Sequence, residues 1–85
     1  MLTAEQLRAA RALIRWEQST VAEKAGVSVE TVKRLEKLDG PLLSTKTATI
    51  HALEAAFRAA GVEFTNGGEP GVKLRRKDQV SVSAP

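Results

Sequence analysis

A glycine set between two short helical patterns constrains this chain more than any other feature of its sequence. From Val21 to Ala25, apolar residues recur at helical spacing. Gly26 follows, where a residue in the left-handed conformation can end a helix without a Cβ clash. Ser28 then has the chemistry to cap a second helix, since its hydroxyl can accept a hydrogen bond from the N–H of Thr31. Residues 18–38 therefore predict two helices joined by a tight turn, which is the outline of a helix-turn-helix.

The second of these helices, expected over Val29–Leu38, has two chemically different faces. Val32 and Leu35 fall on one face and can anchor the helix to a core. The residues directed the other way are Val29, Glu30, Lys33, Arg34 and Lys37. This outer face is either an ordinary solvated helix surface or a surface that contacts a ligand.

The whole pattern resembles a known family. It reads Ala22-x-x-Ala25-Gly26-Val27-Ser28-x-x-Thr31-Val32-x-x-Leu35-Glu36. In this form it is similar to the DNA-binding core of the XRE family, the Cro/cI-repressor-like regulators. The likeness extends upstream through Ala10-Arg11 and Trp16-x-Gln18, and downstream through Ala48-Thr49-Ile50 and Leu53-Glu54-Ala55-Ala56, so it covers roughly residues 2–64.

Length and composition agree with one small helical domain. The chain has 85 residues, of which 42% are hydrophobic, and a net charge of +3 that is compatible with nucleic acid without requiring it. It contains no cysteine, which excludes disulfides and thiolate metal sites. It also lacks a signal peptide and an apolar run of about 20 residues. We therefore expect a cytoplasmic, nucleoid-associated protein that does not enter a membrane.

The expected fold is mainly α: a four-helix, lambda-repressor-like DNA-binding domain over residues 1–61, with a short C-terminal β-hairpin. Thr3 and Gln6 form a capping box for a helix from Ala4 to about Arg15. A second helix is expected over Gln18–Ala25. After the pair described above, we expect a loop over Leu42–Lys46, and then a fourth helix that is capped by Ser44 or Thr45 and runs to Ala60.

The period changes from helical to alternating after Gly61. Val62–Phe64 and Val72–Leu74 read as two strands of a hairpin extension over residues 62–76, followed by a polar tail over 77–85. An isolated two-stranded hairpin is marginal in water, so it should lie on the helices or add strands to a second subunit. The residues expected at a dimer interface are Phe57, Val62, Phe64, Val72 and Leu74.

The resemblance implies particular roles for residues of the helix-turn-helix. Base edges in the major groove would meet Val29, Glu30, Lys33 and Arg34. An arginine or lysine can donate to guanine, a glutamate can accept from cytosine, and a valine can contact the thymine methyl group. The residues expected to contact phosphate are Gln18, Ser28, Thr31, Thr45 and Lys46. Ser28 has the competing role of helix cap.

Other conspicuous residues point to structure rather than chemistry. The family resemblance implies an ion pair between Arg11 and Glu36 that ties the first helix to the third. His51 is the only histidine, so we expect no metal and no cofactor. No nucleophile–base set or phosphate-binding glycine loop is present, so we expect no enzyme. The basic cluster at residues 75–77 could be an arm that reaches a phosphate or a solubilising charged end.

These observations predict a sequence-specific, double-stranded-DNA-binding transcriptional regulator, a repressor, acting as a homodimer on a palindromic operator. One helix-turn-helix reads only a few base pairs, and a two-fold dimer doubles the site. The alternative is a protein-binding module of the antitoxin or anti-activator type, in which the same fold grips a regulatory protein partner. A non-specific DNA-coating protein is a third class, for which a charge of +3 is small.

Overall fold

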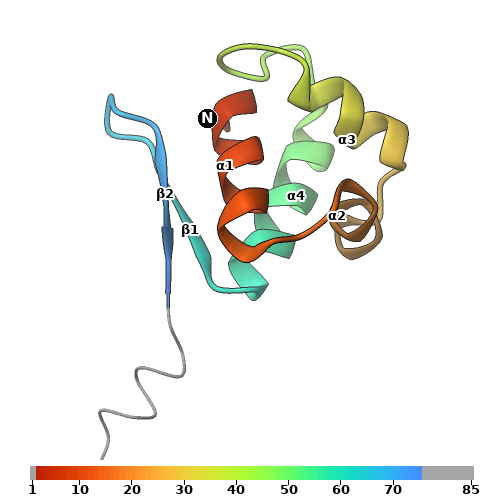
Figure 1. Ribbon diagram of the computed structural model, residues 1–85. Coiled ribbons are helices and arrows are strands. Elements are labelled where there is room, and N and C mark those ends of the chain that lie inside the picture. The colour runs from red at the N-terminus through yellow and green to blue at the C-terminus, as the bar shows by residue number, and fades with distance from the viewer. Residues whose placement is uncertain (1, 76–85) are drawn as a thin grey trace, which may run out of the picture.

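A computed structural model describes residues 2–75. Within this range the protein is mainly helical, with four helices followed by one antiparallel two-stranded hairpin, as predicted (Figure 1). The helices are α1 (Ala4–Ile14), α2 (Gln18–Ala25), α3 (Val29–Glu36) and α4 (Thr47–Ala59). The strands are β1 (Val62–Thr65) and β2 (Gly71–Leu74). The expected polar tail, residues 77–85, lies outside the described residues.

Helix α1 begins at the predicted capping box. The Thr3 hydroxyl accepts a hydrogen bond from the Gln6 backbone N–H at 3.0 Å, and the Gln6 side-chain oxygen accepts one from the Thr3 N–H at 3.0 Å. The helix ends at Ile14, one residue earlier than predicted, because Arg15 takes the left-handed conformation with φ 57° and caps it. The reciprocal cap satisfies the backbone N–H groups of Thr3 and Gln6 and so defines the start of α1.

The turn between α2 and α3 has the geometry that the sequence predicts. Gly26 is left-handed, with φ 71°, and the N–H of Val27 donates to the carbonyl of Ala22 at 3.0 Å. The Ser28 hydroxyl accepts from the N–H of Thr31 at 3.1 Å and so caps α3. Helix α3 is shorter than predicted, since Lys37 is already its C-cap.

The core is formed by apolar residues from all four helices and from the hairpin. Phe57 lies at its centre, between the Trp16 ring at 5.4 Å and the Phe64 ring at 6.0 Å. Phe57 and Val62 are both 0% exposed. Our assignment of these two residues to a dimer interface is therefore wrong, because neither has surface left to offer a second copy. Phe64 and Val72 pack against the core while remaining partly exposed.

The segment between α3 and α4 is held more firmly than a surface loop would be. Leu42, which we expected in a loop, is 1% exposed, and its N–H donates to the carbonyl of Leu2 at 3.1 Å. The N–H of Thr45 donates to the Leu42 carbonyl at 3.2 Å, and this turn delays the start of α4 to Thr47. The prediction that Ser44 or Thr45 caps α4 is wrong: Lys46 is the N-cap, and its side chain makes no capping bond.

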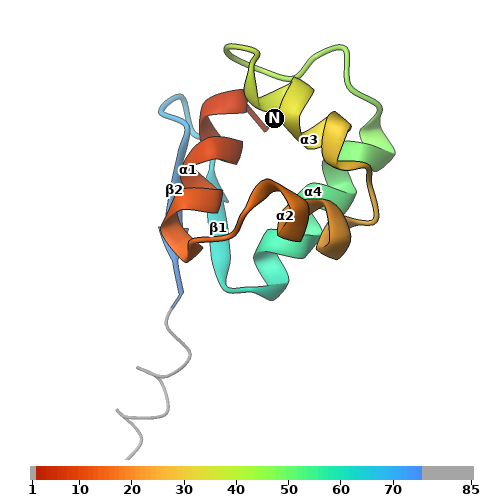
Figure 2. The same ribbon diagram turned by 45° about the vertical axis from the view of Figure 1, so that its right-hand side comes forward.

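The hairpin lies on α1 and α4, which is one of the two arrangements that its short length allowed (Figure 2). Val62 is opposite Leu74, and Phe64 is opposite Val72. The amide of Gln6, reaching out of α1, donates to the carbonyls of Thr65 at 2.9 Å and Gly71 at 3.0 Å. Packing and these hydrogen bonds together replace the third strand that a free hairpin would need.

Gly61, at the junction of α4 and β1, allows the hairpin to fold back. It has φ +98°, and a Cβ there would meet the Arg75 carbonyl oxygen at 2.9 Å.

Gly61→Ala is expected to destabilise the protein by about 1–3 kcal/mol, because the left-handed backbone and the contact are both unfavourable for alanine. Urea unfolding followed by circular dichroism measures this. Gly67→Ala is the matched control, since Gly67 has open space around its Cβ position and no positive φ. Equal losses in the two variants would contradict the prediction.

Among residues 2–75, no helix has both the length and the apolar character needed to cross a membrane.

Candidate nucleic-acid interface

The outer face of α3 is polar, charged and open. Val32 and Leu35 are 0% exposed and fix the rear of the helix in the core. Glu30, Lys33 and Arg34, three of the four residues predicted to read bases, are exposed on the opposite side. The result is a rigid helix that directs two cations and one carboxylate away from the protein.

Val29, the fourth predicted base reader, has a different environment. It is partly buried and packs against the core. Only part of its side chain is therefore available to a ligand. Its position in the first turn of α3 still places it beside the exposed Glu30.

A hollow of about 270 Å³ joins α3 to the start of α4. It is lined by Thr31, Arg34, Ser44, Thr45, Lys46 and Thr49. Thr31 and Arg34 come from α3, whereas Thr45 and Lys46 come from the segment before α4, so the fold brings together four residues predicted from separate parts of the sequence. Ser44 and Thr49 were not predicted as site residues. Thr49 could have been predicted from its position three residues after Lys46, because that spacing places it in the first turn of α4, on the same side of the helix as Lys46.

Two features of this hollow suit an anion. The Thr45 hydroxyl oxygen is buried and has no hydrogen-bond partner among the described residues. The first backbone N–H groups of α4 have no side-chain cap, because Lys46 provides none. A phosphate oxygen near them would gain hydrogen-bond donors, the positive end of the helix dipole, and the Lys46 and Arg34 charges.

The predicted ion pair between Arg11 and Glu36 is present and bidentate. Arg11 Nε donates to Glu36 Oε2 at 2.7 Å, and Arg11 Nη2 donates to Oε1 at 3.0 Å. This bonding raises the pKa of the Arg11 guanidinium above its ordinary value. The Glu36 side chain is only 6% exposed, so its carboxylate is shielded from water, whereas the Arg11 side chain is 28% exposed. It joins α1 to the end of α3.

Gln18, predicted to contact phosphate, is part of the same network. Its amide Nε2 donates to Glu36 Oε1 at 3.1 Å, and the side chain is half-buried at the first residue of α2. One amide hydrogen is thereby committed to Glu36. A ligand contact by Gln18 would have to use its remaining polar atoms or the uncapped N–H groups of the first turn of α2.

Ser28 and Thr31 share a hydrogen bond between their hydroxyl oxygens at 2.8 Å. The Ser28 oxygen also accepts from the Thr31 backbone, so this residue serves as a helix cap, the competing role noted for it. Both hydroxyl groups are near the surface, and one hydrogen of the pair is free to turn outward.

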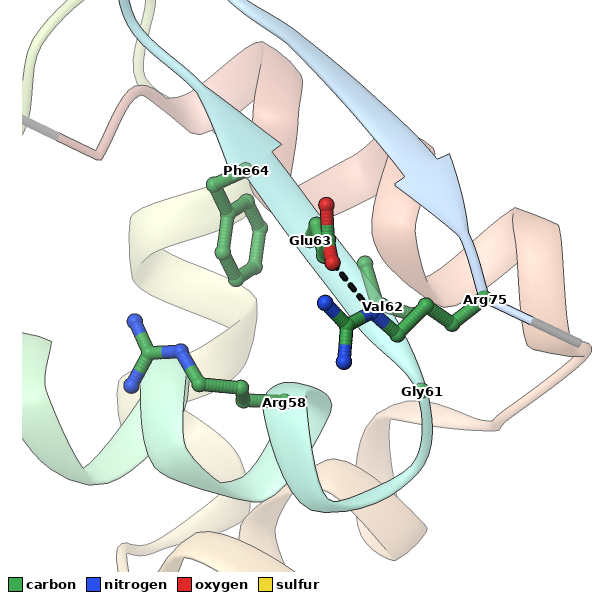
Figure 3. A pocket seen from close by; sticks show the side chains of 6 residues that line it. All are labelled: Arg58, Gly61, Val62, Glu63, Phe64 and Arg75. Carbon is green, nitrogen blue, oxygen red and sulfur yellow. Dashed lines mark ion pairs between the residues drawn. The ribbon is translucent and has the colours of Figure 1, made fainter. Parts of the chain in front are cut away.

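A second hollow, of about 280 Å³, lies between the last turn of α4 and β1 (Figure 3). Arg58 borders it on the α4 side, while Phe64 and the ion-paired Glu63 and Arg75 border it on the hairpin side. Of the residues considered for DNA contact, only Arg75 lines this hollow. Of the basic cluster at residues 75–77, only Arg75 belongs to the described residues, and the other two lie outside them.

In the described part of the chain, no group of three histidine, cysteine, aspartate or glutamate side chains comes together to bind a metal ion.

The features above define a small, mainly helical domain with one charged helix face and an adjoining polar hollow. Comparison of the sequence with protein-family models finds none that matches, and comparison with curated proteins finds no significant match.

Proposed function

We propose that this protein is a sequence-specific regulator of transcription, a repressor, with the lambda-repressor-like fold of the XRE family. The observation that carries the proposal is the continuity of one surface. The outward residues Lys33 and Arg34 adjoin the hollow at the start of α4, where Thr45 and Lys46 offer an unpartnered hydroxyl and a cation. A helix that enters the major groove needs base-reading residues and phosphate contacts side by side, and this surface offers both.

Each part of the surface has a separate task in this proposal. Arg34 and Lys33 donate to guanine N7 and O6, and Glu30 accepts from a cytosine amino group. Thr45, Lys46 and the uncapped N–H groups of α4 bind a backbone phosphate and set the position of α3 in the groove. Occupying an operator would then block or recruit polymerase sterically, in the cytoplasm and in association with the nucleoid.

A two-fold homodimer on a palindromic operator belongs to the proposal because one copy of α3 spans few base pairs. Half-sites would lie about one helical turn, roughly 34 Å, apart. Since Phe57 and Val62 are buried, the dimer has to use other surface. Sedimentation with and without operator DNA tests this step, and a 1:1 complex with a single half-site would argue against it.

The test of DNA reading is selection of preferred sequences from a random duplex pool, followed by affinity measurements across a salt series. We expect a palindromic consensus. Arg34→Ala should weaken binding to that consensus by about 1–3 kcal/mol and relax preference at one base position. The matched control is Arg58→Ala, which removes the same charge from an exposed residue at the far end of α4. Equal binding to consensus and random duplexes, or equal effects of the two substitutions, would overturn the proposal.

The alternative function is a protein-binding module of the antitoxin or anti-activator type. The partly buried Val29 and the 75% exposed Leu43, both near the charged face, favour it over plain DNA coating. Co-purification of a stoichiometric protein partner, together with weak affinity of the isolated chain for any duplex, would support this alternative.

A further inference from the structure

The outer edge of β2 is open. In Figure 1, β2 forms a margin of the molecule with no other described element beyond it, and in Figure 2 helix α1 passes in front of it. The sheet has only two strands, so the far side of β2 has no neighbouring strand in the described structure. Within residues 2–75, its backbone groups on that side have no strand to bond with.

The register identifies which backbone groups point outward. The Arg75 N–H donates to the Gly61 carbonyl, so this pair is hydrogen-bonded across the hairpin. Bonded and non-bonded pairs alternate in an antiparallel ladder. Val72 and Leu74 therefore belong to non-bonded pairs, and their N–H and C=O groups face away from β1.

The two faces beside this edge differ in chemistry. Val72 packs toward the core, and Leu74, two residues on and thus on the same face, is 36% exposed. Lys73 and Arg75 are exposed on the opposite face, where Arg75 pairs with Glu63 of β1 (Figure 3). Along the edge, two cations thus alternate with two apolar residues.

This arrangement disfavours a second copy of the same strand. In a symmetric antiparallel pair of two β2 strands, the outward-facing backbone groups of one copy have to bond to those of the other. A register centred on Lys73 places Lys73 opposite Lys73, and one centred on Leu74 places Lys73 opposite Arg75. Like charges directly opposite one another destabilise a strand pair, and an edge lysine discourages self-association. A register centred on Val72 avoids these contacts but sets Pro70, which has no N–H, opposite Leu74.

We propose that the open edge of β2 binds an extended acidic segment of another protein as an added strand. Acidic residues of the segment would lie opposite Lys73 and beside Arg75, while its alternating apolar residues would cover Leu74 and Val72. The backbone groups of Val72 and Leu74 provide the hydrogen bonds. Because β2 and α3 lie on opposite sides of α1 in Figure 1, the proposal does not depend on the proposed DNA binding.

The experiment titrates the full chain with a synthetic peptide of alternating valine and glutamate, acetylated and amidated at its ends, and follows amide signals by NMR. We expect shifts confined to β2 and its neighbours, with slower hydrogen exchange at the Val72 and Leu74 amides. Lys73→Glu should weaken binding about tenfold and favour a valine–lysine peptide instead. Lys24→Glu, the same charge change at an exposed residue of α2, is the matched control and should bind as the parent does.

A backbone variant tests the edge itself. Leu74→Pro removes an outward N–H without removing a bond to β1, so the fold should tolerate it while peptide binding is lost. Peptide binding that persists in this variant would overturn the proposal. So would the absence of shifts in β2 at millimolar peptide. Protection of the same two amides by added operator DNA, or by raising the protein concentration alone, would assign the edge to DNA or to a second copy and overturn it as well.

Discussion

Phe57→Ala is expected to lower the free energy of unfolding by about 3–5 kcal/mol, the cost of truncating a fully buried aromatic residue. The side chain is 0% exposed and packs between the rings of Trp16 and Phe64, so its removal leaves a cavity where the α1–α2 junction, α4 and β1 meet. Small domains have a total stability of about 5–15 kcal/mol, so this loss would remove a large part of it.

Urea unfolding followed by circular dichroism measures the effect of Phe57→Ala. Measurements at two protein concentrations separate a core residue from an interface residue, because only loss of an interface would make the stability change depend on concentration. Leu43→Ala is the control: Leu43 is 75% exposed and should change stability by no more than about 0.5 kcal/mol. A loss below about 1 kcal/mol for Phe57→Ala, or one that shrinks on dilution as a dimer dissociates, would return Phe57 to the interface.

Features that depend on near neighbours in sequence were predictable. The Thr3–Gln6 capping box and the Ser28 cap each involve residues three apart, and the left-handed Gly26 is marked by its lack of a side chain. For the same reason the bounds of α2 agree with the prediction. The helical period also predicted Lys33 and Arg34 on the outer face, because the apolar Val32 and Leu35 had to lie on the face that packs against the core.

Features that depend on distant contacts were not predictable. Periodicity identified Phe57 and Val62 as apolar, but it does not say whether the covering surface comes from the same chain. Here Trp16 and the hairpin supply it, which removed both residues from the proposed interface. Leu42 was expected in a loop, and its burial follows from the pairing of this segment with residues 2–4.

The candidate site likewise combines residues that the sequence predicts with features that only the assembled fold produces. Thr45 and Lys46 were named for their place before the fourth helix, yet the hollow that unites them with Arg34 exists because the Leu42–Thr45 turn sets the direction of the segment before α4. No local sequence signal encodes the unpartnered Thr45 hydroxyl, since burial without a partner is a property of the assembled fold.

Glu36→Ala is expected to cost about 2–3 kcal/mol of stability. Removing one partner of a buried ion pair typically costs about 3–5 kcal/mol, and water around the 28% exposed Arg11 side chain offsets part of that cost. The substitution leaves the Arg11 guanidinium with the Trp16 carbonyl, at 3.2 Å, as its one acceptor among residues 2–75, and it removes the acceptor of the Gln18 amide. Thermal and urea unfolding at low and high salt measure the effect, and salt should change it little because the pair is shielded.

A double-mutant cycle separates the pair from its surroundings. Arg11→Met alone should be the most damaging change, because it leaves the 6% exposed Glu36 carboxylate without its cation. The double variant Arg11→Met, Glu36→Met replaces the pair with apolar side chains of similar length, and it should be more stable than Arg11→Met alone. The second single variant of the cycle is Glu36→Met. If the double variant lost the sum of the Arg11→Met and Glu36→Met losses, the side chains would not be coupled. In that case the connection from α1 through Glu36 to Gln18 would not hold the candidate interface in place.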